Sequence, residues 1–258
     1  MCKELEYIPA TLKVVEYVSV HYGCPKCKTD DEKPNIIHAP VPAALLRSYA
    51  SPSIVAWVIY SKYVNGMPLY HQEKDWLQYG FELSRATMAN WVIECTDKYL
   101  RVLYEFYHRL LLSRGFAMAD ESRIQVLKEE GHEATAKSYM WLFRSGEDDT
   151  PPIVLYKYAS THSGDVAKEF LKGFNGYLMA DGYTGYNKVQ DIKRCCCFAY
   201  IRRYFFDAIP KRKNRDISCP AVQGVEYCDK LFAYERHFKE KGYSYKQIKM
   251  VVSRKKNR

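Results

Sequence analysis

The sequence predicts an α/β protein in which a mixed sheet with flanking helices follows a helical region and a small N-terminal segment. Up to residue 115 the apolar residues of the longer segments recur at three- and four-residue spacing, which is typical of helices. After residue 115 they form short extended runs rich in β-branched and aromatic residues. We therefore divide the chain into residues 1–40, 41–115 and 116–258.

The composition of the chain indicates which kind of partner it binds and in which cell compartment it lies. Lys and Arg outnumber Asp and Glu by 39 to 30, and this net charge of +9 fits either a polyanion partner such as DNA or a merely basic protein. No apolar run approaches the roughly 20 residues of a membrane span, and the N-terminus lacks the pattern of a secretory signal. The nine cysteines, three of them adjacent, are poor material for disulfides, so we expect a cytoplasmic protein.

Residues 1–40 contain half of a zinc-binding pattern. Cys24 and Cys27 form one Cys-x-x-Cys knuckle, whereas a structural zinc ion needs four ligands. Cys2 and His21 are candidate substitutes, although their spacing matches no known zinc motif. We expect a partial, zinc-ribbon-like segment that binds Zn²⁺ only if further ligands complete it.

Residues 41–115 predict three helices. Ser51 caps the first, which ends at Asn65-Gly66, and Gly80 ends the second. Ser84 caps the third, which we expect to run to residue 112. Two helices joined by a short glycine-containing turn indicate either a DNA-binding helix-turn-helix or the commoner helical hairpin. The large apolar residues expected to face the core of this region are Trp91, Tyr99, Leu103, Phe106 and Leu110.

Residues 116–258 predict the sheet and its helices. The strands are expected in FAMAD, RIQVLKE, YMWLFRS, PIVLYKYA, GYLMAD and CCCFA. The helices are expected in GDVAKEFLKGF, YIRRYFFDAI and AVQGVEYCDKLFAYERHFKEKG, the last of them after a basic loop. This order is ribonuclease-H-like: an initial group of strands is followed by a helix, two further strands and closing helices.

Two aspartates are candidate metal ligands. Asp120 closes one predicted strand and Asp181 closes a later one, at the edge of the sheet where α/β folds place their chemistry. Two close carboxylates repel each other and favour a hard divalent cation such as Mg²⁺ between them. Two such ions about 3.5–4 Å apart can activate an attacking oxygen and stabilise a leaving one. The plain alternative is that both aspartates merely begin turns.

A third carboxylate would help to hold the metal. Glu235 is the first choice, because apolar neighbours would pack its helix on the sheet, and Glu226 on the same helix is the rival. Glu121 follows Asp120 directly and should point away from it along a strand. These residues alone indicate metal-dependent phosphoryl transfer or hydrolysis. Glycoside hydrolysis also uses paired carboxylates, but the basic surroundings argue against it.

Longer motifs carry a family resemblance over nearly the whole chain. They are LEYIPATLKVVEYVSVHYGCPKC, SPSIVAWVIYSKYVNGMPLYHQEKDW, LSRATMANWV, MADESRIQVL, GYLMADGYTGYN and LFAYERHF. Together they resemble transposases of the insertion-sequence 66 family, with Ser122 where that family has threonine. The resemblance implies an Asp-Asp-Glu metal triad of Asp120, Asp181 and Glu235 on a ribonuclease-H-like catalytic domain, using Mg²⁺ or Mn²⁺.

The implied activity is DNA strand cleavage and strand transfer at the ends of an insertion sequence. Water would free a 3′ hydroxyl at the end of the element, and that hydroxyl would attack target DNA. The implied partners are the terminal inverted repeats, target DNA and further copies of the chain, in the cytoplasm at the nucleoid.

The sequence also departs from the family pattern. Tyr200 replaces a histidine, whereas Arg202 and Arg203 remain as candidate contacts to DNA phosphates, together with Lys211, Arg212 and Lys213 in the basic loop. Both ends of the chain look truncated beside the family pattern. The alternative interpretation is therefore a non-catalytic DNA-binding remnant of a transposase.

Overall fold

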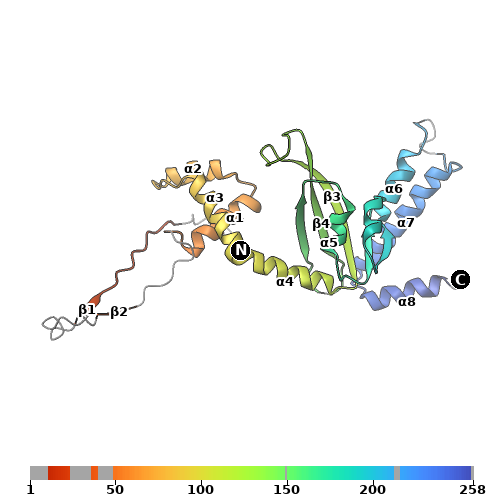
Figure 1. The fold of residues 1–258 in the computed structure, drawn as a ribbon. Helices are drawn as coiled ribbons and strands as arrows, with labels where there is room; N and C mark the ends of the chain where they lie inside the picture. The colour runs from red at the N-terminus through yellow and green to blue at the C-terminus, as the bar shows by residue number, and fades with distance from the viewer. Residues whose placement is uncertain (1–10, 24–35, 40–48, 149, 212–215, 257–258) are drawn as a thin grey trace, which may run out of the picture. The chain divides into compact units, whose positions relative to one another are not determined.

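The computed structural model describes residues 11–23, 36–39, 49–148, 150–211 and 216–256. The chain forms two compact units, Met1–Val102 and Leu103–Arg258, each of which is described by itself (Figure 1). The division falls within helix α4 (Arg101–Leu112), shortly before the boundary predicted at residue 115.

The first unit is built mainly from α1 (Pro52–Tyr63), α2 (Leu69–Gln78) and α3 (Arg85–Cys95), which pack on one another. Ser51 and Ser84 cap α1 and α3 through their hydroxyl groups, as the sequence predicts. The core of these helices is made of Ala50, Val55, Val58, Leu83, Met88, Trp91 and Cys95.

Residues 11–20 have no regular secondary structure, and a short antiparallel pair follows them. Strand β1 (His21–Gly23) pairs with β2 (Ile36–His38), and His21 lies opposite His38 with their ring centres 5.0 Å apart. The predicted zinc ligands Cys24 and Cys27, and the substitute Cys2, lie outside the described residues.

The third predicted helix is continuous but not uniform. The π-helical segment η2 (Thr96–Leu100) joins α3 to α4. The prediction of core-facing side chains is correct for Trp91, which is 3% exposed, and wrong for the other four. Their exposed fractions are 42% for Tyr99, 52% for Leu103, 47% for Phe106 and 36% for Leu110. Helical periodicity shows that a helix has an apolar face but not how much of that face is covered.

The second unit contains a five-stranded mixed sheet in the order β5-β4-β3-β6-β7. Its strands are β3 (Phe116–Gln125), β4 (Lys137–Ser145), β5 (Val154–Ala159), β6 (Tyr177–Ala180) and β7 (Lys193–Cys196). Strands β3, β4 and β5 are antiparallel neighbours, whereas β6 is parallel to both β3 and β7. The two strands predicted in FAMAD and RIQVLKE are one strand, because β3 pairs with β4 without interruption as far as Gln125.

The remaining elements are helical. They are α5 (Gly164–Phe170), the 3-10 helix η3 (Thr184–Lys188), α6 (Phe198–Asp207), α7 (Pro220–Glu240) and α8 (Tyr245–Lys256). Helices α6 and α7 pack on each other, and α8 was not predicted from the sequence. No helix in the described ranges has both the length and the apolar character needed to cross a bilayer.

One face of the sheet carries the main core of the second unit. The inward residues of β3, β4 and β6 alternate with less buried ones and pack against α5 and η3. Trp141 and Phe143 of β4 are fully buried, and the Phe143 ring stacks on Phe170 of α5 with centres 3.9 Å apart. This stack joins the sheet to the helix that leads into β6.

A glycine allows β6 to start close to β3. The Tyr177 amide donates to the Gly115 carbonyl at 3.0 Å, just before the two strands begin to pair. A Cβ on Gly176 would lie 2.4 Å from that carbonyl oxygen, which no side chain tolerates. Gly176 therefore helps to fix where β6 meets β3.

We expect Phe143→Ala to lower the free energy of unfolding of the second unit by about 3–5 kcal/mol, because it leaves a cavity and removes the stack on Phe170. Urea unfolding followed by circular dichroism measures this change. The control is Tyr156→Ala on β5, whose side chain is 59% exposed and whose loss should cost no more than about 0.5 kcal/mol. Equal stability of the two variants would contradict this account of the core.

Candidate metal-binding site

The pairing of β3 with β6 sets the two predicted aspartates at the same level of the sheet. Ala117 lies opposite Leu178 and Met118 opposite Met179 in this parallel pair. The pairing ends there, and the same register continued two residues further would set Asp120 opposite Asp181. Asp181 follows β6 directly, as predicted. The prediction that Asp120 closes a strand is wrong, since β3 runs on to Gln125.

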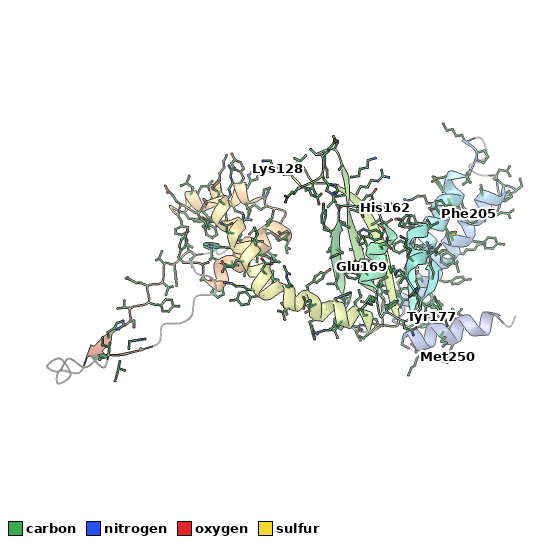
Figure 2. The ribbon with its side chains drawn as sticks, in the orientation of Figure 1. Lys128, His162, Glu169, Tyr177, Phe205 and Met250 are labelled. Atoms are coloured by element: carbon green, nitrogen blue, oxygen red, sulfur yellow. The ribbon has the colours of Figure 1, made fainter. Side chains whose placement is uncertain are left out.

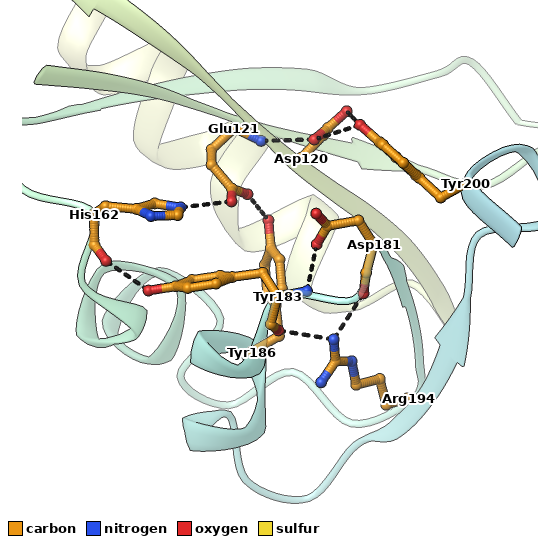
Figure 3. A network of polar contacts seen from close by, with 8 residues as sticks. All are labelled: Asp120, Glu121, His162, Asp181, Tyr183, Tyr186, Arg194 and Tyr200. Atoms are coloured by element: carbon orange, nitrogen blue, oxygen red, sulfur yellow. Dashed lines mark hydrogen bonds and ion pairs between the residues drawn. The ribbon is translucent and has the colours of Figure 1, made fainter. Parts of the chain in front are cut away.

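Tyr200 lies against the carboxylate of Asp120. It comes from the first turn of α6, and its hydroxyl is 3.0 Å from Oδ2 and 3.3 Å from Oδ1 of Asp120 (Figure 3). The Glu121 amide also donates to Asp120 Oδ1, at 2.9 Å. Tyr200, which the sequence analysis expects to replace a histidine, is thus in direct contact with the candidate site.

Asp181 begins a turn held by its own side chain and by Arg194. Asp181 Oδ1 accepts from the Tyr183 amide at 2.9 Å. Arg194 of β7 donates to the carbonyl oxygens of Asp181 and Tyr183, at 2.7 and 2.8 Å. Arg194 Nε is buried and has no hydrogen-bond partner among the described residues. The guanidinium thus fixes the backbone of the turn and leaves the Asp181 side chain on the other side of it (Figure 3).

The negative charges of both aspartates raise the pKa of two nearby tyrosines. Burial, the hydrogen bond to Asp120 and the charges of Asp120 and Asp181 together raise the pKa of Tyr200 to about 12. Burial and the contact with Glu121 raise the pKa of Tyr186 far above its usual value, and the charges of Asp181 and Asp120 add to the rise. Both hydroxyl groups therefore remain protonated donors at neutral pH.

Glu121, which the sequence analysis set aside as a metal ligand, is buried and takes part in contacts beside the site. Its side chain is 7% exposed, with Oε1 2.7 Å from His162 Nε2 and Oε2 2.5 Å from the Tyr186 hydroxyl. His162 lies in the loop between β5 and α5 (Figure 2). Its ring stacks between those of Tyr139 and Tyr183. The prediction that Glu121 points away from Asp120 agrees with these contacts, but no sequence spacing pointed to its partners.

The third carboxylate is not assembled with the pair. Glu235 lies on α7 and is exposed, whereas its rival Glu226 is half-buried on the same helix. Within the described ranges, no three His, Cys, Asp or Glu side chains form a group able to hold a metal ion. The role of Glu235 as a metal ligand therefore stays a prediction.

The basic residues near the site differ in whether an acidic side chain already pairs with them. Arg202 is paired with Asp229 of α7 at 2.6 Å, an ion pair that joins α6 to α7. Arg203 is exposed, and its guanidinium lies 5.1 Å from the centre of the Tyr200 ring. Both arginines line a shallow depression on α6 and α7 together with Phe232. Lys211 is exposed, and Arg212 and Lys213 lie outside the described residues.

The donors at the site suit a hard divalent cation. Asp120 and Asp181 offer carboxylate oxygens, the ligand type that Mg²⁺ and Mn²⁺ prefer. Mg²⁺ is commonly held by only one or two carboxylates, with water and substrate phosphate completing the shell. The residues present therefore fit such an ion, although one hydroxyl already lies on the carboxylate of Asp120.

Comparison with known proteins identifies the family. Residues 47–258 match the model of the Transposase IS66 family, and the chain therefore belongs to this family. No solved structure matches the chain.

The curated relatives are longer proteins of Sinorhizobium fredii. Uncharacterized protein y4qI is 30% identical over 189 residues, which cover 67% of this chain and 34% of that protein. Uncharacterized protein y4jD is 27% identical over 219 residues, covering 80% of this chain and 42% of the relative. Uncharacterized protein y4hP is 25% identical over 251 residues, covering 90% and 44%. The chain thus spans less than half the length of each of these relatives.

We expect Tyr200→Phe to tighten the binding of Mn²⁺, by up to about tenfold, because the cation no longer competes with a hydroxyl for the oxygens of Asp120. Electron paramagnetic resonance of free Mn²⁺ during a titration measures the affinity. Tyr227→Phe on α7 is the control, since that ring is 67% exposed. Weaker binding in Tyr200→Phe would show instead that the hydroxyl helps to present Asp120 to the metal.

Proposed function

We propose that this chain carries the catalytic part of a transposase that cleaves and rejoins DNA with the help of a divalent metal ion. The observation that carries the proposal is the parallel register of β3 and β6, which leads toward Asp120 and Asp181, within the region that matches the transposase family. A bound Mg²⁺ or Mn²⁺ would supply the positive charge that stabilises the attacking and leaving oxygens of a phosphodiester. Asp120 and Asp181 would hold it, and Glu235 is proposed as a third ligand.

The order of the sheet supports a ribonuclease-H-like fold for the second unit. Its strands run β5-β4-β3-β6-β7, with three antiparallel strands followed by two that are parallel to β3. Along the chain, these strands and the helices between and after them follow the order that the sequence predicts for that fold. The first of the parallel strands, β6, carries the second aspartate at its end.

DNA is the proposed substrate and partner. Net charge of +9 favours binding to a polyanion, and Arg203 is an exposed cation beside Tyr200. The pair α2 and α3 is proposed as a DNA-binding helix-turn-helix, with terminal inverted repeats and target DNA as its ligands. We also propose that the protein acts as a multimer, in the cytoplasm at the nucleoid. Zinc bound by Cys24 and Cys27 is part of the same proposal.

A second candidate function is DNA binding without catalysis. Two observations favour it: the described residues assemble no third carboxylate with the pair, and the Tyr200 hydroxyl lies on Asp120. It predicts salt-sensitive DNA binding and no cleavage with either Mg²⁺ or Mn²⁺.

Asp120→Asn and Asp181→Asn test the metal site. We expect each to lower Mg²⁺-dependent nicking by about a hundredfold or more, because the stabilisation supplied by the metal amounts to several kcal/mol. Nicking is measured on supercoiled plasmid that carries the DNA flanking the gene, and DNA binding is measured in parallel by fluorescence anisotropy. DNA binding should persist in both variants. Unchanged nicking in either variant would remove that aspartate from the site, and no nicking by the unmodified chain would favour the second function.

Arg203→Ala tests the proposed DNA surface. Losing one phosphate contact should weaken the binding of duplex DNA and reduce the slope of log affinity against log salt by about one. Arg202→Ala is the matched control on the same helix, because the Asp229 carboxylate already pairs with that charge. Equal effects of the two substitutions would argue against a phosphate contact specific to Arg203.

A further inference from the structure

Beside the aspartates, five residues form a closed ring of contacts, and Figure 3 draws the hydrogen bonds among them. Glu121 accepts hydrogen bonds from the Tyr186 hydroxyl and from His162 Nε2, at 2.5 and 2.7 Å. The Arg194 guanidinium lies 5.8 Å from the centre of the Tyr186 ring and donates to the Tyr183 carbonyl. The Tyr183 hydroxyl donates to the His162 carbonyl at 2.5 Å, which closes the ring.

This ring joins the two pieces of backbone that carry the aspartates. Glu121 is the residue after Asp120 in β3. Arg194 and the Tyr183 amide hold the turn that begins at Asp181. Glu121, through Tyr186, thus ties the strand that bears Asp120 to the segment that bears Asp181.

Because the ring of contacts is buried, its hydrogen bonds must stay in place. Tyr186 is fully buried, and the side chain of Glu121 is almost so. A buried carboxylate that lacks hydrogen bonds is costly, so Glu121 can be accommodated here only while its donors remain in place. A close approach of two glycines locks the same segment, since a Cβ on Gly164 would lie 2.2 Å from the Gly185 carbonyl oxygen.

We propose that Glu121 is a positioning residue for the metal site: through Tyr186 and His162 it holds the Asp181 turn at the distance from β3 at which both aspartates bind one cation. The inference rests on the proposed function. Glu121 itself does not touch the metal, because successive residues of β3 point to opposite faces, and Glu121 contacts Tyr186 and His162 on the face away from Asp120.

Tyr186→Phe separates positioning from direct ligation. The substitution keeps the aromatic ring of residue 186 in the core and removes only the hydroxyl that donates to Glu121. A positioning role predicts that Mn²⁺ binds the full chain about tenfold more weakly, as for the loss of other residues that orient metal ligands. A role for Glu121 as a ligand predicts the opposite, because Tyr186→Phe frees one of its oxygens. Tighter or unchanged binding would overturn the proposal.

The controls guard against a general loss of structure. Tyr158→Phe removes a hydroxyl that donates to Ser138 Oγ at 3.0 Å and should leave Mn²⁺ affinity unchanged. Thermal unfolding of each variant is recorded, and an unaltered midpoint with weaker Mn²⁺ binding supports positioning. If Tyr186→Phe does not fold, Glu121→Gln and Glu121→Ala decide the question. Positioning requires that Glu121→Gln, which keeps an acceptor for Tyr186, binds Mn²⁺ more tightly than Glu121→Ala, and equal affinities would overturn it.

Failure of this inference is distinguishable from failure of the proposed function. Asp120→Asn and Asp181→Asn are titrated with Mn²⁺ in the same series. If they bind as the unmodified chain does, the metal site itself is wrong. If they lose Mn²⁺ while Tyr186→Phe does not, the metal site stands and only the positioning role of Glu121 is rejected.

Discussion

The parallel pairing of β3 with β6 is the constraint on which the candidate site depends. The two strands come from distant parts of the sequence, and their register decides which residues lie opposite each other. A shift of one residue would set Asp181 beside Ala119 or Glu121 and would turn neighbouring side chains to the other face. Gly176 helps to fix the start of the pairing, because only a residue without a side chain fits against the Gly115 carbonyl.

The two aspartates differ in how their backbone is held. Asp120 lies inside β3, where the continuous ladder with β4 fixes its main chain on one side. Asp181 lies just beyond β6, where no backbone hydrogen bond to a neighbouring strand holds it within the described part of the chain. The contacts of Arg194 and Tyr183 replace those bonds in the turn. A site built from one strand residue and one turn residue needs such support, since a metal ion tolerates little error in the placement of its ligands.

Much of this architecture could be predicted because it follows from local patterns. The alternation of apolar residues located the strands, the caps located the helices, and the apolar run before Asp181 placed that residue at a strand end. The end of β3 was misplaced after Asp120, because polar residues in its second half resemble a break when the partner strand is unknown. The contacts of Glu121 could not be predicted either. They join β3, the loop before α5 and η3, and nothing in the spacing of these segments shows that they meet.

Two tyrosine hydroxyl groups donate to acidic side chains at the site, and their effects on metal affinity should differ. Tyr200 donates to Asp120 itself and so competes with a cation for the same oxygens. Tyr186 donates to Glu121, which points to the opposite face of β3 from Asp120, and so holds that carboxylate beside the site without adding a ligand. Two tyrosines with similar chemistry would then have opposite influences on metal affinity, one by occupying a ligand and the other by holding the structure around it. The distinction follows from which carboxylate each hydroxyl contacts, and composition or spacing alone would not reveal it.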